Sequence, residues 1–343
     1  MMDGYALRAA DTAGAPCFLD VIARIAAGQA DLPQIGAGQA AWINTGAPLP
    51  PGADTVVPVE QTRGEVELLG PAERGQHVMR RGSLMERGAV VAEGALTPER
   101  IAACAAQGCD PVEVLRRPRV AVLATGSELR RVPGAHEIRN SNGPMLLALL
   151  LGCGAEPIEL GVADDETGAL NAALERGLAE ADVLVTTGGV SKGDLDLVRP
   201  ALEALGAEVV FHGVSLQPGK PVLYARHRGS TAVFGLPGNP ASTLICADLF
   251  LLPHVAVLAG REFDEVIATR RGRLTAPARS SPKRRRVFPC ILRGDDVDPM
   301  PWRSSADLYS LGRCNAYMVL EAGQDISKGA EVECLVPERF ARS

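Results

Sequence analysis

The loop TTGGVSKGDLD, at residues 186–196, carries the strongest local signal for chemistry in this chain. Its two consecutive glycines, Gly188 and Gly189, allow a backbone to approach a ligand closely. Ser191 can donate to a phosphate, and Asp194 or Asp196 can bind a magnesium ion through carboxylate oxygen. A tight turn followed by a capped helix explains the same residues, because aspartate is common at a helix start. Taken alone, the loop leaves both interpretations open.

A single cation stands between two prolines in QPGKP, at residues 217–221. Lys220 has a rigid backbone there, next to Pro221, and can present a point charge to an oxyanion. A solvated turn lysine is the simpler interpretation of an isolated motif.

The segment LPGNPAS, at residues 236–242, has the pattern of a helix start. Asn239 fits the N-cap and Pro240 the first turn, so free N–H groups and Ser242 can face an anion. A capped helix accounts for these residues as well, but it leaves Gly238 unexplained.

Acidic residues follow two of the expected strands, Glu128 in TGSEL and Asp164 in VADDE. Carboxylates at a strand's carboxyl end can bind ribose hydroxyls, amino groups or a metal, although a solvated rim or a helix cap is equally common. Near the start of the chain, NTGAPLPPGADTVV places Thr45 in a Pro/Gly-rich hairpin, with Glu60 shortly after it. Glu128 and Asp164 each follow an expected strand, and this repeated placement favours ligand contact for both.

These loops follow short apolar runs that suit strands covered on both faces. A helix is predicted over residues 165–181, where Leu170, Leu174 and Leu178 recur at helical spacing. Strand and helix in alternation predict an α/β fold with a doubly wound, mostly parallel sheet, whose loops converge at the carboxyl ends of the strands. The expected strands are residues 120–124, 157–161, 183–187, 208–211, 221–224 and 232–236.

A length of 343 residues predicts more than one domain. Short strands broken by Gly and Pro predict an N-terminal β-rich domain over residues 1–87, with strands at 17–22, 39–43, 55–58 and 66–69. A helical linker segment over residues 88–116 contains a predicted helix at 96–107, capped by Thr97 with Pro98 in its first turn. The α/β domain is then expected over residues 117–262. A small C-terminal β-barrel follows over residues 263–343, with strands at 287–292, 316–321 and 331–336.

Composition excludes several classes of protein. A net charge of −6 argues against nucleic-acid binding, and the basic run at residues 283–286 is interpreted as a solvated face. None of the eight cysteines forms a C-x-x-C pair, and the five histidines lack metal-ligand spacing, so a zinc site or a disulfide framework is not expected. The longest apolar runs fall below the roughly 20 residues that span a bilayer, and the start of the chain has no signal-like segment. The chain is therefore predicted to be cytoplasmic and not membrane-bound.

Together these motifs resemble one family, that of the molybdopterin molybdenumtransferases (MoeA), which is similar to the gephyrin E domain. The resemblance covers nearly the whole chain in order. It implies magnesium-dependent cleavage of AMP from adenylylated molybdopterin and insertion of molybdenum from molybdate. It also implies an elongated homodimer whose site combines two subunits. The motifs are MDGYA, NTGAPLPPGADTVV, TGSEL, NSN, DVLVTTGGVSKGDLD, PGKP and GLPGNPAS.

The resemblance also implies roles for individual residues. Asp3, Thr45 and Glu60 fall on the side that a partner subunit supplies. The pterin side is formed by Glu128, Asp164, Ser191 and Asp196, and the molybdate side by Lys220, Pro221, Ser242 and Ser305.

Several positions depart from the family pattern. Gln217 and Gly213 stand where cations are usual, Cys290 stands where an arginine usually follows the aromatic residue, and Leu84 lies where an acidic residue is expected. Losing cations weakens a site for a dianion, because charge-assisted hydrogen bonds are about twice as strong as neutral ones. Arg284 to Arg286 are candidate substitutes. MDGYA also stands at the very start, where family members carry an additional segment that contributes helices to the dimer.

Three functions follow from these observations. The first is an active molybdenum insertase. The second is a non-catalytic molybdopterin-binding paralogue, a carrier or chaperone that hands the cofactor to a molybdoenzyme or another cofactor-biosynthesis protein. The third is a generic nucleotide-phosphate enzyme. The first is favoured, because the ligand loops are retained as whole motifs.

Overall fold

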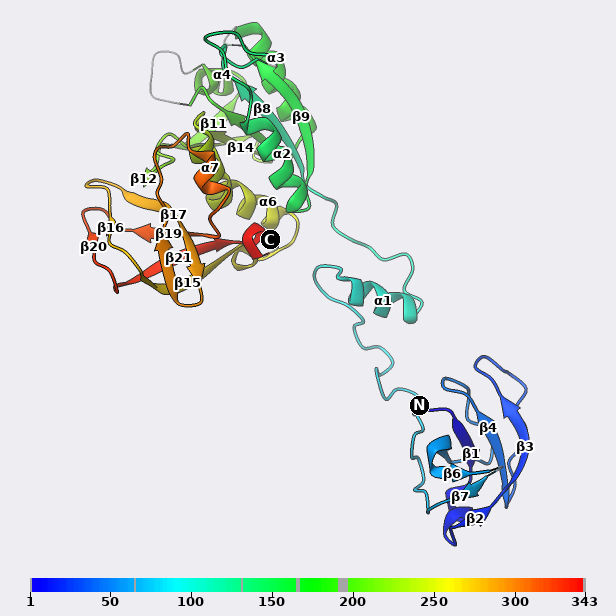
Figure 1. Cartoon of the computed structure of the whole chain (residues 1–343). Coiled ribbons are helices and arrows are strands. Elements are labelled where there is room, and N and C mark those ends of the chain that lie inside the picture. Colours follow the sequence, from blue (N-terminus) through cyan, green and yellow to red (C-terminus); the bar gives the residue numbers. More distant parts are fainter. Residues whose placement is uncertain (1, 65, 131, 165–166, 191–196, 342–343) are drawn as a thin grey trace. The chain divides into compact units, whose positions relative to one another are not determined.

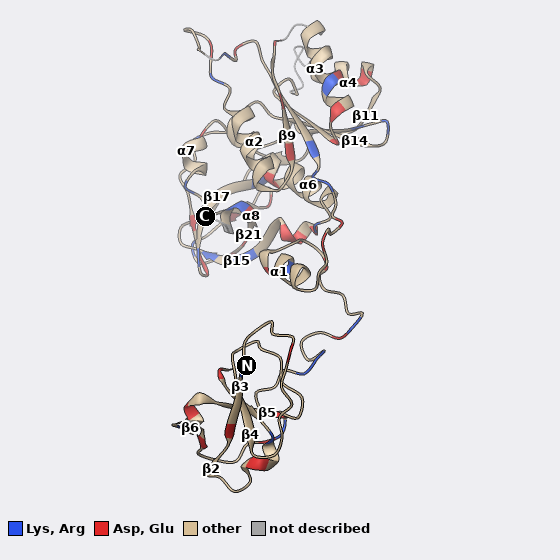
Figure 2. Ribbon diagram, turned by 90° about the vertical axis from the view of Figure 1, so that its right-hand side faces the viewer, with Lys and Arg blue, Asp and Glu red and all other residues tan. Residues whose placement is uncertain are grey.

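The computed structural model describes residues 2–64, 66–130, 132–164, 167–190 and 197–341, and Figure 1 labels helices and strands where there is room. The chain divides into two compact units, Met1–Val91 and Ala92–Ser343. Lys, Arg, Asp and Glu are interspersed along both units, as Figure 2 shows. Each unit is described by itself below.

The first unit is built on a four-stranded sheet with the order β3-β4-β1-β5. Its central strand β1 (Gly4–Leu7) is buried along its whole length and pairs antiparallel with β4 (Gln39–Ile43) and β5 (Thr55–Pro58). This strand, which holds most of the MDGYA motif, was not predicted. The other elements are β3 (Asp20–Ile25), β2 (Cys17–Phe18), β6 (Thr62–Arg63), β7 (Glu67–Leu68) and the short helices η1 (Ala9–Thr12) and η2 (Val59–Gln61).

The second unit begins with the predicted helix, α1 (Pro98–Ala106). The Thr97 side chain accepts a hydrogen bond from the Arg100 backbone N–H, and Pro98 occupies the first turn, as the sequence indicated. Most of the helix is exposed, with only Cys104 buried.

A six-stranded sheet follows, with the order β11-β13-β14-β10-β8-β9. Strands β9, β8, β10 and β14 are parallel. Strand β13 runs antiparallel to both neighbours, so the prediction of a parallel strand at residues 221–224 was wrong; an apolar run does not encode direction. The strands are β8 (Arg119–Thr125), β9 (Glu156–Ala163), β10 (Val183–Thr187), β11 (Ala207–His212), β13 (Leu223–His227) and β14 (Thr231–Leu236).

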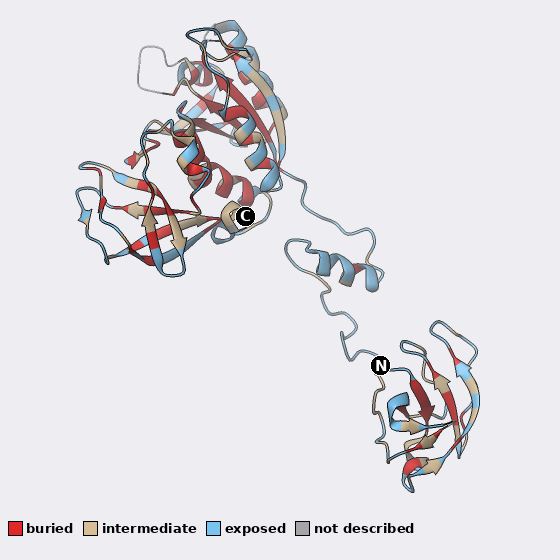
Figure 3. Cartoon of the chain, in the orientation of Figure 1, coloured by how far each residue is buried: buried red, intermediate tan, exposed pale blue. Residues whose placement is uncertain are grey.

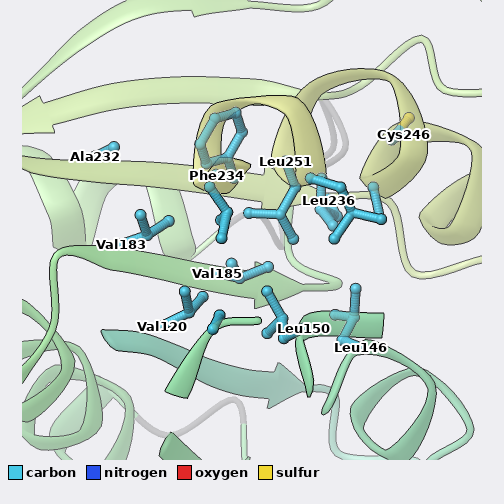
Figure 4. Close-up of a cluster of buried hydrophobic side chains, with 14 of the residues drawn as sticks. Val120, Leu146, Leu150, Val183, Val185, Ala232, Phe234, Leu236, Cys246 and Leu251 are labelled. Carbon is cyan, nitrogen blue, oxygen red and sulfur yellow. The ribbon is translucent and has the colours of Figure 1, made fainter. Parts of the chain in front are cut away.

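Helices pack on both faces of this sheet, which explains why its central strands are apolar without alternation. On one face, α3 (Thr167–Glu180) and α4 (Val198–Ala204) cover a cluster that contains Leu170, Leu174 and Leu184. The other face contacts α2 (Asn142–Gly152), α5 (Pro240–Cys246), η3 (Ala247–Leu251) and α6 (Leu252–Leu258). Figure 3 shows buried residues concentrated in these central strands, and Figure 4 shows Val185 and Phe234 facing side chains of that second group of helices.

Helices α5, η3 and α6 run on without a break over Pro240–Leu258. This stretch is long and apolar enough to cross a membrane by length and composition, with a mean hydropathy of 1.8. However, 72% of it is buried inside the protein, where it packs against the sheet. Its apolar character is therefore explained by its place in the core.

The C-terminal strands form a second six-stranded sheet, with the order β12-β17-β18-β15-β21-β19. Strand β19 also pairs with β17, so five of these strands form a closed ring of pairings. The elements are β12 (Leu216–Gln217), η4 (Phe263–Glu265), β15 (Ile267–Leu274), β16 (Ala278–Arg279), β17 (Arg285–Arg293), β18 (Asp296–Pro299), α7 (Leu308–Leu311), β19 (Ala316–Leu320), β20 (Asp325–Ile326), β21 (Glu331–Pro337) and α8 (Glu338–Ala341).

A buried polar cluster joins this sheet to the long helix. Asp248, in η3, is 1% exposed and accepts a hydrogen bond of 2.7 Å from the Tyr317 hydroxyl. Arg339 donates to the same carboxylate from Nε and Nη2, at 3.0 and 2.9 Å. Burial and the adjacent Asp248 charge raise the pKa of Tyr317 well above its ordinary value, so the hydroxyl stays protonated as the donor.

Candidate functional site

Three parallel strands, β8, β10 and β14, end beside one another, and their loops form the first part of the site. The Gly188 N–H donates to the Leu236 carbonyl at 3.1 Å. Gly188 has φ +88°, and a Cβ there would lie 2.5 Å from the Thr125 carbonyl oxygen. A Cβ at Gly189 would lie 2.7 Å from Val198. Close packing of the loops therefore requires both glycines, and their ligand role stays a prediction.

The loop before α5 is fixed from two sides. Asn239 is the N-cap of α5, as predicted, but its side chain makes no capping hydrogen bond. The Thr243 hydroxyl donates to the Pro237 carbonyl at 2.5 Å, and the Asn142 amide donates to the Gly238 carbonyl at 2.8 Å. Gly238, which a capped helix alone did not explain, is thus the point where α2 holds this loop.

Near the carboxyl ends of these parallel strands, two buried oxygens have no hydrogen-bond partner among the residues that the structure describes. They are Asn142 Oδ1, at the start of α2, and Thr186 Oγ1, near the end of β10. Buried polar atoms are normally paired, so such atoms mark places where a ligand or water completes the structure. The NSN motif contains Asn142, but its side chain was not predicted as a site residue.

Two of the predicted carboxylates on the pterin side, Asp164 and Glu128, differ in their contacts. Asp164 is half exposed and forms an ion pair of 3.0 Å with Arg130, which also lies 3.2 Å from Glu137. Glu128 is exposed, and its carboxylate folds back over the backbone of Gly126. Within the described part of the chain, no group of three or more His, Cys, Asp or Glu residues is placed to hold a metal ion. The predicted residues Ser191, Asp194 and Asp196 lie outside the described residues.

The second part of the site is a cavity of about 320 Å³ between the sheet and the C-terminal strands. Its position follows from two contacts: the Ala241 N–H donates to the Ser305 carbonyl at 2.9 Å, and β12 pairs with the start of β17. Ser242 is buried in its wall, whereas Lys220 is exposed. The structure thus brings together all four residues assigned to the molybdate side. The cavity is lined by Gln217, Pro218, Gly219, Lys220, Pro221, Ser242, Arg284, Arg286, Trp302, Arg303, Ser304 and Ser305.

Cations other than Lys220 line this cavity, and they include two of the candidate substitutes named from the sequence, Arg284 and Arg286. Arg284, Arg286 and Arg303 join Lys220, and no carboxylate is among the described lining residues. Interpreting the whole run 283–286 as a solvated face was therefore wrong for Arg284 and Arg286. Arg285, by contrast, points elsewhere and forms an ion pair of 2.7 Å with Glu321. Burial lowers the pKa of Arg286 from its ordinary value, but an arginine stays charged at neutral pH.

Two of the residues that depart from the family pattern have structural explanations. Gly213 has φ +98°, a conformation that a lysine rarely adopts. Cys290 is fully buried in the C-terminal core, where its thiol contacts that of Cys334, and this contact together with burial raises its pKa. Neither position supplies a charge to the cavity. Leu84 is exposed in the first unit, and nothing in the structure explains it.

The first unit contains the other predicted residues. The Asp3 carboxylate accepts a hydrogen bond of 2.6 Å from the Thr45 backbone N–H, so these two predicted residues lie together. Glu60 is exposed in η2, beside Val59, whose N–H donates to the Asp3 carbonyl at 3.2 Å. The three residues thus gather near the start of β1.

Comparison with protein families accounts for most of the chain. Residues 1–108 match the MoeA N-terminal region (domain I and II), residues 121–256 a probable molybdopterin binding domain, and residues 271–336 the MoeA C-terminal region (domain IV). The molybdopterin molybdenumtransferase of Bacillus subtilis is 33% identical, over 97% of this chain and 82% of that protein. The chain belongs to the molybdopterin molybdenumtransferase family.

Other members of the molybdopterin molybdenumtransferase family are also similar to this chain, in sequence and in structure. The enzyme of that name from Nostoc is 39% identical over 76% of this chain, which spans 63% of the length of the Nostoc protein. The crystal structure of a molybdopterin biosynthesis MoeA protein from Pyrococcus horikoshii is 33% identical and superposes with a TM-score of 0.82, covering 98% of this chain and 86% of that one. The mixed α/β fold is therefore that of the molybdenumtransferase family.

Proposed function

We propose that this chain is a molybdopterin molybdenumtransferase of molybdenum cofactor biosynthesis, which inserts molybdenum from molybdate into adenylylated molybdopterin and releases AMP. The observation that supports this most is the cavity around Lys220 and Ser242. Its described side chains offer cations, hydroxyls and N–H groups, and no carboxylate. Such a lining suits a small oxyanion, since every oxygen of that ligand accepts hydrogen bonds.

Each of the two parts of the site binds a different substrate. Lys220, Ser242 and Ser305 hold molybdate in the cavity. The glycine loops hold the pterin and its phosphates, where Gly188, Gly189 and Gly238 let the ligand approach the backbone. The loop at residues 236–242 connects both parts, since Gly238 lies at one end and Ser242 at the other. In this arrangement the protein brings molybdate to the dithiolene and keeps it there.

Further features of the proposal come from the family resemblance. Magnesium assists AMP cleavage, with Asp194 and Asp196 as its candidate ligands and Glu128 and Asp164 nearby on the pterin side. The chain acts in the cytoplasm as a homodimer, in which Asp3, Thr45 and Glu60 of one subunit complete the site of the other. The six-stranded sheet is the doubly wound ligand domain, and the C-terminal ring of strands is a small barrel.

The test is AMP release from adenylylated molybdopterin after molybdate and magnesium are added. We expect release by the wild type, and at least a tenfold slower rate for Lys220→Ala, because that variant removes a charge-assisted contact worth about 1.5–3 kcal/mol. Lys328→Ala removes an exposed lysine outside the cavity and should leave the rate unchanged. Asp196→Ala tests the magnesium role in the same assay.

A non-catalytic carrier is the alternative function, motivated by the uncharged residues at Gln217 and Gly213. Three arginines in the cavity weaken that motive, because they supply charge from other positions. Wild-type protein that binds molybdopterin but releases no AMP would move the assignment to the carrier.

A further inference from the structure

Two N–H donors in the wall of the cavity have no acceptor. Arg286 Nε and Trp302 Nε1 are both buried, and neither has a hydrogen-bond partner among the described residues. Both residues line the cavity that also contains Lys220 and Ser242. Leaving a buried N–H unpaired costs about 1–3 kcal/mol, so two such groups in one small cavity indicate an acceptor that the protein does not supply.

The two donors are held in place by one aromatic ring. The Arg286 guanidinium lies over the Phe288 ring, 4.5 Å from its centroid. The Trp302 ring packs edge-on against the same ring, with 5.7 Å between the centroids and an interplanar angle of 80°. A further guanidinium nitrogen of Arg286, Nη1, donates to the Arg279 carbonyl at 2.7 Å. Nε is therefore the buried guanidinium nitrogen of Arg286 that has no partner among the described residues, and these contacts hold both side chains in place.

We propose that Arg286 and Trp302 are binding residues for the oxyanion substrate, and that each donates one hydrogen bond to an oxygen of molybdate. The inference rests on the proposed function for the identity of the anion. It goes beyond that function by naming donors that the family motifs do not contain. Arg284 and Arg303 supply further positive charge to the same cavity. The chain thereby compensates for Gln217 and Cys290, which stand where cations are usual.

The experiment measures molybdate binding by the full chain, through equilibrium dialysis with metal analysis and no pterin present. Arg286→Lys keeps the charge but removes Nε–H, and Trp302→Phe keeps an aromatic ring beside Phe288 but removes the indole N–H. We expect each variant to bind molybdate about tenfold more weakly. Arg285→Lys, on the outward-facing neighbour that pairs with Glu321, should bind as the wild type does.

The same variants are assayed for AMP release over a range of molybdate concentrations. We expect the half-saturating concentration to rise about tenfold with little change in the maximal rate, as for loss of a binding contact. Unchanged binding and unchanged half-saturation in both folded variants would overturn the inference, while wild-type AMP release keeps the proposed function. Conversely, a wild type without AMP release removes the proposed function, and dialysis still decides the anion site. Thermal unfolding checks that both variants fold; if Trp302→Phe does not, Arg286→Lys decides.

Discussion

Polar groups differ in their pairing at the two ends of the parallel strands in the six-stranded sheet. We call the side where these strands begin the amino edge and the side where they end the carboxyl edge. At the amino edge, Asp182 accepts two hydrogen bonds of 2.6 Å from the Arg116 guanidinium and one of 2.8 Å from the Arg119 N–H. At the carboxyl edge, Thr186 Oγ1 and Asn142 Oδ1 are buried without a partner among the described residues. The paired edge stabilises the fold, whereas buried unpaired groups are normally completed by a ligand or water.

The largest expected effect on stability and activity comes from a substitution at the carboxyl edge. Gly188→Val places a branched side chain at φ +88°, with its Cβ 2.5 Å from the Thr125 carbonyl oxygen. We expect the free energy of unfolding to fall by about 3 kcal/mol and AMP release to be lost, because strain and overpacking add at one position. Urea unfolding and the AMP assay measure the two effects. A variant with wild-type stability would show that the loop can relax and that the contact is not a constraint.

A smaller effect on the free energy of unfolding is expected at the amino edge, and this effect depends on pH. The Arg116 guanidinium lowers the pKa of Asp182 below its ordinary value of 3.8. A lowered carboxyl pKa stabilises the folded state above the unfolded value, and this stabilisation is lost as the pH falls through the folded value. Asp182→Asn should therefore lower the free energy of unfolding by about 1 kcal/mol at pH 7, since Arg116 is largely exposed.

The matched control is Glu156→Gln, at the same edge, whose ion pair with Arg119 is longer, at 3.9 Å, and exposed. It should change stability by no more than about 0.3 kcal/mol. The difference between Asp182→Asn and wild type should shrink in unfolding measurements below pH 3.8. AMP release should be unaffected by either variant, because neither residue lies at the carboxyl edge. A tenfold loss of activity in Asp182→Asn would break the contrast between the edges.

The smallest expected effect concerns the unpaired hydroxyl of Thr186, which is fully buried. Thr186→Val removes an oxygen that has no partner and keeps a branched side chain of similar size. We expect the free energy of unfolding to rise by about 0.5 kcal/mol, because an unsatisfied buried group is removed. Thermal unfolding of the ligand-free protein measures it. A clear loss of stability would mean that the hydroxyl is paired in solution.

The sequence predicted those parts of the fold that depend on local pattern. The apolar runs that became β8, β10 and β14 were found because both faces of these strands are covered, and α1 was found from its cap, Thr97. Strand β1 was missed because its four residues, GYAL, include a glycine and an alanine and no β-branched residue, so they give only a weak strand signal. Strand β15, IATRRGRL, was missed because its exposed arginines obscure the pattern of a strand.

The candidate site was predictable where motifs are contiguous, as for Lys220 and Ser242. Arg284 and Arg286 were only candidate substitutes in the sequence, because they reach the cavity from another sheet, through the pairing of β12 with β17. Period-two alternation contains the signal: Arg284 and Arg286 line the cavity, while Arg285 between them does not. Trp302 follows β18 in an irregular segment, where no periodicity indicates a direction.

The hydrogen bonds around Asp248 determine how the second unit can come apart. If the C-terminal strands detached from the long helix, the Asp248 carboxylate would lose both Tyr317 and Arg339 inside an apolar environment. Breaking a buried ion pair in this way costs about 3–5 kcal/mol. The sheet and the C-terminal strands should therefore unfold as one cooperative block, so a truncated chain ending near Gly260 would be a substrate for proteases and not an independent domain.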